Sequence, residues 1–388
     1  MLKYYKDHEI IPVHQNLPKT DFPRFRFQRE SLYRNLGVHF GSIAGKRVIE
    51  FGPGTGDNAM ALASVVPSQL VLVDGNPSSI RELNSRFSSA NFLNRGGSDN
   101  NISIVENDLL QLTPIDLGYF DFVIAEGIIN GQSSPPEVLR HVSTFVKPGG
   151  ILVITAVNSF GVLDQALRRT YLPAIKAQTS NFTELVQKCS EVFSSHLSFL
   201  PTTKPIEDWV QDSITHPLPS NYIHSSDEAV KLLDEHFLFL GSSPKWHNDF
   251  RWHKALTIEN DKTNESFIAQ SKFMNLLSLD DRMNNPLDIW VSVKDLDLEQ
   301  LDKICRKIWA LSSKIVESNS YDMLDDLISQ LDDFHQKTEG KLEHISESIS
   351  EYLHGITKIS KGEIDFPMPN LSRWWGRGLN YLSLLRRG

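Results

Sequence analysis

Residues 47–62 are RVIEFGPGTGDNAMAL, an apolar run followed by a glycine-rich turn and the start of a helix. The apolar run has the length and composition of a buried strand. Glycines at Gly52, Gly54 and Gly56 allow positive φ angles and let a ligand approach the backbone without meeting a Cβ. This strand, turn and helix predict a binding site for a ligand of the nucleoside type.

Similar apolar runs recur along the chain and alternate with amphipathic stretches. They occupy residues 47–51, 70–74, 102–106, 122–125 and 151–157 and are rich in Val, Ile and Leu. Strands buried on both faces have this composition, and the alternation is typical of a parallel sheet with helices on both sides. We therefore expect an α/β fold.

Two further strands are expected after a helical insert. Residues 159–224 change to helical spacing, and residues 226–236 predict one more helix. Residues 237–241 and 250–256 predict a terminal antiparallel hairpin. With it, the sheet becomes a seven-stranded, mostly parallel, Rossmann-like sheet, and the insert becomes a lid.

The rest of the chain is predicted to be helical. A polar linker at 260–265 precedes three apolar stripes with helical spacing. We expect an N-terminal cover (1–46), a main domain (47–258) that contains the insert, and a C-terminal helical appendage (265–388). The appendage would pack on the main domain or on a second copy in a homo-oligomer.

The residues around the turn help to choose the ligand. Asp57 stands where a dinucleotide fingerprint has its last glycine or alanine, and a carboxylate there would repel a pyrophosphate. No Gly-Lys-Ser/Thr follows the turn, which disfavours a nucleoside triphosphate. Asp74 ends the next strand, about where an acid binds ribose hydroxyls. S-adenosylmethionine carries no phosphate, and its cationic groups suit Asp57 and Glu50.

Four ordered elements carry a family resemblance. They are EFGPGTG at 50–56, VDGN at 73–76, ENDL at 106–109, and FDFVIAE at 120–126 followed by VKPGG at 146–150. Over about residues 28–258 the chain resembles the class I S-adenosylmethionine-dependent methyltransferases. The resemblance implies an enzyme that uses S-adenosyl-L-methionine and releases S-adenosyl-L-homocysteine.

The resemblance also implies which residues bind this donor. Glu50 and the glycine turn would hold its methionine end, Asp74 its ribose and Asp108 its adenine amino group, with Leu109 beside the adenine ring. Glu126 would face the methionine moiety and the reacting methyl. The full implied set is Glu50, Gly52, Pro53, Gly54, Gly56, Asp74, Gly75, Asp108, Leu109, Glu126 and Gly127.

The methyl acceptor is less defined. Residues 125–130 depart from the Asn-Pro-Pro-Tyr motif of the family branches that methylate amides and amino bases. We expect O-methylation of a small molecule or a glycan-type hydroxyl enclosed by the insert. A hydroxyl needs a general base, and His216 and His224 are the candidates. Either histidine could instead cap or bridge helix ends.

Three other functions stay open. The chain could methylate a macromolecule, RNA or a peptide side chain, with the C-terminal helices as a docking module. It could be a non-catalytic scaffold that binds S-adenosylmethionine or S-adenosylhomocysteine. An aminopropyl transferase is the most remote alternative.

Composition limits the partners and the compartment. The net charge of -9 disfavours nucleic acid, although a local basic groove stays open. Two distant cysteines predict neither a metal site nor a disulfide, and a cytoplasmic protein without a transmembrane segment is expected. The tail at 371–387 could contact a membrane surface or an anionic polymer, or could pack its aromatic side chains on the protein.

Overall fold

The computed structural model describes residues 2–11, 21–88, 101–200, 204–245, 247, 249, 251–257, 261–283 and 286–388, without the side chains of residues 2 and 286–288. The chain divides into two compact units. The first comprises Met1–Ala156, His224–Ser271 and Asn380–Gly388, and the second Val157–Ile223 and Lys272–Leu379.

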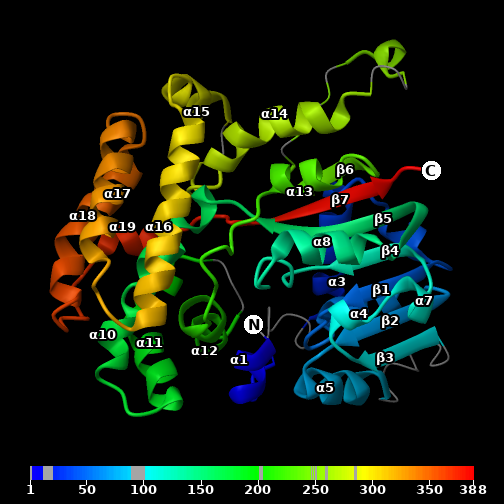
Figure 1. Ribbon diagram of the computed structural model, residues 1–388, viewed down its shortest axis with the longest axis horizontal. Helices are drawn as coiled ribbons and strands as arrows, with labels where there is room; N and C mark the ends of the chain where they lie inside the picture. The colour runs from blue at the N-terminus through cyan, green and yellow to red at the C-terminus, as the bar shows by residue number, and fades with distance from the viewer. Residues whose placement is uncertain are drawn as a thin grey trace. The chain divides into compact units, whose positions relative to one another are not determined.

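The first unit is built on a seven-stranded sheet (Figure 1). Its strands are β1 (Arg47–Phe51), β2 (Gln69–Asp74), β3 (Ile102–Glu106), β4 (Phe120–Ala125), β5 (Val146–Val157), β6 (Phe237–Ser243) and β7 (Leu379–Arg386). They lie in the order β3-β2-β1-β4-β5-β7-β6. Strands β1 to β5 pair in parallel, and β6 pairs with β7 antiparallel. The predicted seven-stranded, mostly parallel α/β sheet is thus confirmed.

Each face of the sheet has its own hydrophobic core because alternate strand residues point to opposite sides. Val48 and Leu72 pack with α3 (Phe22–Asn35), α4 (Asp57–Ala63) and α5 (Pro77–Ser88). Ile49 and Val73 pack with α8 (Pro135–Ser143), α13 (Ser226–Leu233) and Phe267 of α14 (Thr263–Leu276). The shorter elements are α1 (Leu2–Asp7), η1 (Phe40–Ile43), η3 (Leu109–Gln111), α7 (Pro114–Leu117) and η6 (His253–Ala255).

The partner of β6 differs from the sequence prediction. Of residues 250–256, which were expected to form this strand, Phe250 lies outside the described residues, and 253–255 form a 3-10 turn. Trp252 and Leu256 are exposed, so this segment buries no apolar face. The strand comes instead from residues 379–386, where Leu382 and Leu384 are fully buried. Residues 379–386 of the tail are thus a strand of the sheet, and Trp374 and Trp375, which precede it, are buried.

The second unit joins the insert to the later helices. Its elements are η4 (Phe160–Val162), α9 (Leu163–Arg169), α10 (Leu172–Lys176), α11 (Phe182–Leu197), α12 (Ile206–Val210), the π-helix η5 (Gln211–Thr215), α15 (Pro286–Val293), α16 (Leu298–Ser318), α17 (Leu324–Thr338), α18 (Glu343–Ile359) and α19 (Pro369–Arg373). Leu167 and Phe193 of the insert share one core with Ile308 and Phe334. The insert and the expected appendage thus form one structural unit, and the expected linker overlaps the start of α14.

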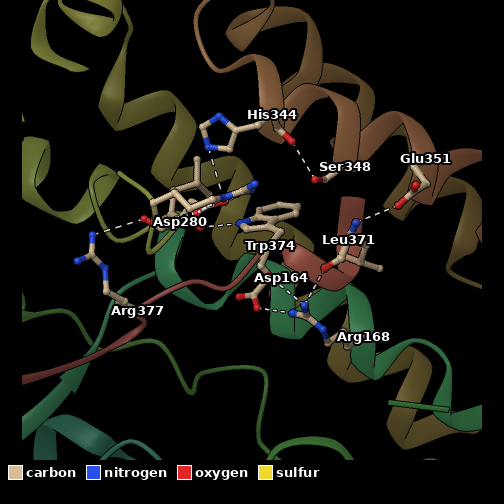
Figure 2. A network of polar contacts seen from close by, with 11 residues as sticks. Asp164, Arg168, Asp280, His344, Ser348, Glu351, Leu371, Trp374 and Arg377 are labelled. Carbon is tan, nitrogen blue, oxygen red and sulfur yellow. Dashed lines mark hydrogen bonds and ion pairs between the residues drawn. The ribbon is translucent and has the colours of Figure 1, made fainter. Parts of the chain in front are cut away.

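A buried polar network lies inside this second unit (Figure 2). Arg168 is fully buried; it pairs with Asp164 and donates to the carbonyls of Leu371 at 2.8 Å and Trp374 at 2.6 Å. Its Nε lies 3.3 Å from Nδ1 of His196. These bonds tie α9 to α19 and satisfy a charge that would be costly to bury alone.

Within the described ranges, no helix combines the length and apolar content that crossing a bilayer requires.

Candidate donor-binding site

The glycine turn has a backbone that only glycine fits well. Gly52, Gly54 and Gly56 have φ angles of 68°, 56° and 79°. A Cβ on Gly52 would lie 2.4 Å from Cγ2 of Ile128, and one on Gly56 would lie 2.6 Å from Cδ2 of Leu83. Ile128 and Leu83 therefore pack closely against the turn and leave no room for a side chain at Gly52 or Gly56. Pro53 is buried within it.

Asp74, at the end of β2, is held by the turn next to it. Its Oδ2 accepts the amide of Gly54 at 3.2 Å, and its Oδ1 accepts the amide of Asn76 at 2.8 Å across Gly75. Burial raises the pKa of Asp74, and these backbone bonds oppose that effect. A carboxylate has about four acceptor positions, so Asp74 can still accept ribose hydroxyls.

Asp108 and Leu109 lie just beyond the end of β3, whose last residue, Glu106, pairs with Asp74. The amide of Asn107 donates to the carbonyl of Asp74 at 3.2 Å, which fixes the two strand ends together. Asp108 is exposed, and its Oδ1 caps the turn η3 by accepting the amide of Leu110 at 3.0 Å. Its other oxygen leaves acceptor capacity that suits an amino group.

Glu126 follows β4 and accepts hydrogen bonds from side chains of two helices. Its Oε1 accepts from Nη2 of Arg29 on α3 at 2.7 Å, and its Oε2 accepts from Nδ2 of Asn58 on α4 at 3.2 Å. The next residue, Gly127, has a φ of 74°, and its amide donates to Oγ1 of Thr155 at 2.7 Å. The ends of β1 to β4 thus bring Glu50, Asp74, Asp108 and Glu126 to one edge of the sheet.

Glu50 carries a buried carboxyl group near Glu126 and Arg29. It is 3% exposed, and among the described residues its Oε2 has no hydrogen-bond partner. Burial, followed by the charge of Glu126, raises the pKa of Glu50 to about 8. An orphaned carboxyl oxygen in an acid-rich environment suits a cationic group, so this end of the site fits the ammonium or sulfonium of S-adenosylmethionine.

Asp57 has a different environment from the one that the sequence argument assumed. It is buried and paired with Arg86 of α5, and its Oδ2 accepts from Oγ1 of Thr55 at 2.9 Å. The ion pair neutralises much of the negative charge at this helix N-terminus. The repulsion of a pyrophosphate by Asp57 is therefore weaker than the sequence alone indicates.

Sequence reasoning missed the contribution of α3. Phe25, Arg29 and Tyr33 form its buried face at a spacing of four residues, and Arg29 lies over the ring of Tyr33 at 5.5 Å. Tyr381 of β7 also lies near this pair, and burial and Glu126 raise its pKa to about 12. The spacing of four residues in α3 could have indicated this contact. It places an arginine on an otherwise aromatic buried face, and a buried arginine requires an acidic partner.

The two candidate bases lie in different units. His216 belongs to the second unit, and burial followed by nearby positive charge lowers its pKa to about 3. A base so weak at neutral pH is poorly matched to proton abstraction. His224 belongs to the first unit, where its carbonyl accepts from Nδ2 of Asn130 at 3.2 Å. Its Nδ1 lies 3.6 Å from Oε2 of Glu228.

Part of the chain is similar in sequence to known methyltransferases. The sequence model of a family described as "Methyltransferase domain" matches residues 24–188. The tRNA U34 carboxymethyltransferase of Syntrophotalea carbinolica is 26% identical over 180 residues, which are 46% of this chain and 47% of that protein. The chain thus spans about half the length of this curated relative.

Solved structures of similar proteins were also found. PKMT2 from Rickettsia typhi, in complex with AdoHcy, has a TM-score of 0.42 and 14% identity, with 64% of this chain and 50% of that chain covered. The N-methyltransferase NodS from Bradyrhizobium japonicum, in complex with S-adenosyl-L-homocysteine, has a TM-score of 0.28 and 21% identity, with 34% and 63% covered. Residues 24–188 thus match a methyltransferase domain, and the glycine turn and the strand order are consistent with a class I S-adenosylmethionine-dependent methyltransferase.

Proposed function

We propose that this chain transfers the methyl group of S-adenosylmethionine to a hydroxyl oxygen of a small-molecule or glycan-type acceptor. The donor supplies an electrophilic methyl group. Glu50, the turn from Gly52 to Gly56, Asp74 and Gly75, Asp108 and Leu109, and Glu126 and Gly127 would bind the donor. Asn130, five residues after the end of β4, supports a nearby base because it fixes the backbone of His224.

His224 is the proposed general base for this reaction. A hydroxyl is a weak nucleophile, so its proton must be removed as the carbon–oxygen bond forms. Glu228 lies near the imidazole and can favour its charged form after it accepts that proton. The same carboxylate also accepts the amide of Ser225 at 2.7 Å and caps α13, so it is held in place.

A second candidate is methylation of a macromolecule, with the helices of residues 272–379 as a docking module. The relative named as a tRNA U34 carboxymethyltransferase favours RNA within this alternative. The net charge of -9 counts against it, because RNA binding relies on clustered lysine and arginine.

A labelling experiment separates the candidates. The protein is incubated with S-adenosylmethionine carrying a tritiated methyl group and a cell extract, which is then divided into RNA, protein and small-molecule fractions. Label in small molecules or glycans supports the first proposal, and label in RNA or protein supports the second. Donor binding without any incorporation would indicate a non-catalytic binding protein.

Two substitutions test the assigned residues. Asp74→Ala should weaken donor binding by about 1–3 kcal/mol, whereas Asp325→Ala, on an exposed part of α17, should not. His224→Gln should retain donor binding and lower turnover by about 100-fold or more. Unchanged turnover in His224→Gln would remove this residue from the reaction.

A further inference from the structure

Residues 2–11, which we call the N-terminal segment, fold as a short helix and a tight turn. α1 ends in a Schellman motif, in which the amide of Ile10 donates to the carbonyl of Tyr5 at 2.9 Å and the amide of Glu9 donates to that of Lys6 at 3.3 Å. Glu9 has a φ of 52°, in the left-handed region that this motif requires. Ile10, the next residue, is buried, with 8% of its surface exposed.

A side chain in the loop after β2 anchors the N-terminal segment. Nδ2 of Asn76, a residue that is 3% exposed, donates to the carbonyl of Ile10 at 3.1 Å. Oδ1 of the same side chain accepts the amide of Ser78 at 3.1 Å, at the start of α5. Both ends of this amide group are therefore used, one to begin α5 and the other to hold the N-terminal segment.

The same loop orients the carboxylate that is proposed to bind the ribose of the donor. The backbone amide of Asn76 donates to Oδ1 of Asp74 at 2.8 Å, so one residue contacts both Asp74 and the N-terminal segment. Burial has the largest effect on the pKa of Asp74 and raises it, while the charge of Lys6 on α1 is among the effects that lower it. α1 therefore lies near this carboxylate, at the ribose end of the site.

The N-terminal segment has little stability of its own. α1 has six residues, whereas an isolated helix in water needs about 12–15 residues to be even marginally stable. Its order therefore depends on anchors such as the burial of Ile10 and the hydrogen bond from Asn76. An element that is held by few contacts can open locally while the rest of the protein stays folded, as an element that controls access to a ligand must do.

We propose that residues 2–11 cover the ribose end of the donor site and must detach from Asn76 before product can leave and new donor can enter. The inference rests on the proposed function, because it places the donor's ribose on Asp74. Asn76 is then a positioning residue, whose side chain holds the N-terminal segment and whose amide holds the carboxylate. A bound ligand would stabilise the attached segment, because it interacts with the segment in that state alone.

Hydrogen exchange of the full chain tests whether the N-terminal segment responds to a ligand. S-adenosylhomocysteine should slow amide exchange in residues 2–11, because it shifts the segment toward the attached state. Exchange in α17, which belongs to the second unit, should stay the same. Equal exchange in residues 2–11 with and without bound S-adenosylhomocysteine would overturn the inference.

The rate at which S-adenosylhomocysteine is released, measured by stopped-flow displacement, tests the two anchors. Asn76→Ser keeps an acceptor for the amide of Ser78 but no longer reaches the carbonyl of Ile10. Ile10→Ser removes the buried side chain and leaves the loop after β2 intact. Each variant should release the product about tenfold faster, the factor to which the loss of about one hydrogen bond corresponds. Because both act through the same segment, the double variant should be little faster than either single one.

Two matched variants control for the substitutions themselves. Asn181→Ser makes the same change at the start of α11, where Oδ1 of Asn181 accepts the amide of Glu184 at 3.0 Å. Ile115→Ser makes the other change at an isoleucine that is 95% exposed. Both variants should release S-adenosylhomocysteine at the wild-type rate.

The remaining outcomes separate the inference from the proposed function. Faster release in Asn76→Ser alone would assign the effect to the loop that carries Asp74 and would overturn the role of the N-terminal segment. Wild-type release rates in both single variants would overturn it as well. If the wild-type protein does not bind S-adenosylhomocysteine, the proposed function itself fails, whereas binding that leaves residues 2–11 unaffected refutes the inference alone.

Discussion

Arg29 and Glu126 lie 97 positions apart in the chain and meet at 2.7 Å between Nη2 and Oε1, with each side chain less than a tenth exposed. Burial disfavours the charge on Arg29, but Glu126 overcomes this effect and raises the pKa of the guanidinium. The pair fastens α3 to the end of β4, at the edge of the sheet where the donor is proposed to bind.

Breaking this pair should destabilise the protein. Arg29→Met leaves Asn58 as the one hydrogen-bond partner of the buried Glu126 among the described residues, and we expect the free energy of unfolding of the first unit to fall by about 3–5 kcal/mol. The double variant with Glu126→Gln should recover part of this loss, because the uncompensated charge is gone. Urea unfolding curves check both values. As a control, Arg26→Met breaks a half-exposed pair with Glu30 and should cost less than about 1 kcal/mol.

Glu50 should make stability depend on pH. Its pKa rises from 4.5 to about 8 on folding, mainly through burial and then through the charge of Glu126. Between these two pH values, the folded protein therefore holds a proton that the unfolded chain has released. Stability should therefore decrease as the pH rises through this window. In Glu50→Gln, the loss of unfolding free energy between about pH 5 and pH 8 should be smaller by a few kcal/mol than in the wild-type protein. The exposed Glu106→Gln should follow the wild-type curve in unfolding experiments across this range.

His216 should affect stability in acid. Its pKa falls from 6.5 to about 3 on burial, so below pH 6.5 the unfolded chain binds a proton that the folded chain does not. The wild-type protein should lose about 2 kcal/mol of stability from this residue between pH 6.5 and about pH 5. His216→Gln should remove that loss, and the exposed His236→Gln should not. Thermal unfolding at both pH values would show the difference, and parallel curves for all three proteins would contradict it.

Strand β7 should be essential to the first unit. Leu384 is fully buried in the core that contains α8 and α13, and Leu384→Ala should cost about 2–5 kcal/mol of unfolding free energy. Leu379, at the start of the same strand, is 44% exposed, and Leu379→Ala should cost much less. Equal losses in a chemical unfolding experiment would mean that the burial of Leu384 is not what holds the strand.

Local sequence patterns predicted most of the sheet. Strands β1 to β5 are apolar runs bounded by turns, and such runs depend on neighbouring residues alone. The glycine turn could be predicted equally well from the sequence, because the positive φ angles at Gly52 and Gly56 favour glycine. The positions of Asp74, Asp108 and Glu126 at strand ends follow from the same local signals.

Contacts between distant segments could not be predicted in this way. The alternating pattern of residues 250–256 resembles a strand as much as residues 379–386 do, and only the burial of Leu382 and Leu384 distinguishes them. The pairing of Arg29 with Glu126 and the shared core of Phe193 with Ile308 likewise depend on the tertiary fold. The sequence could not show that the insert packs with helices more than 70 residues further along the chain.

The position of β7 has a consequence for biosynthesis. In the sheet, β7 lies between β5 and β6, but the ribosome makes its residues only after those of α15 to α19. During that interval β5 has an unpaired edge, and β6 has no antiparallel partner. Unpaired strand edges invite aggregation, so the nascent chain should depend on chaperone protection until residues 379–386 emerge and complete the sheet.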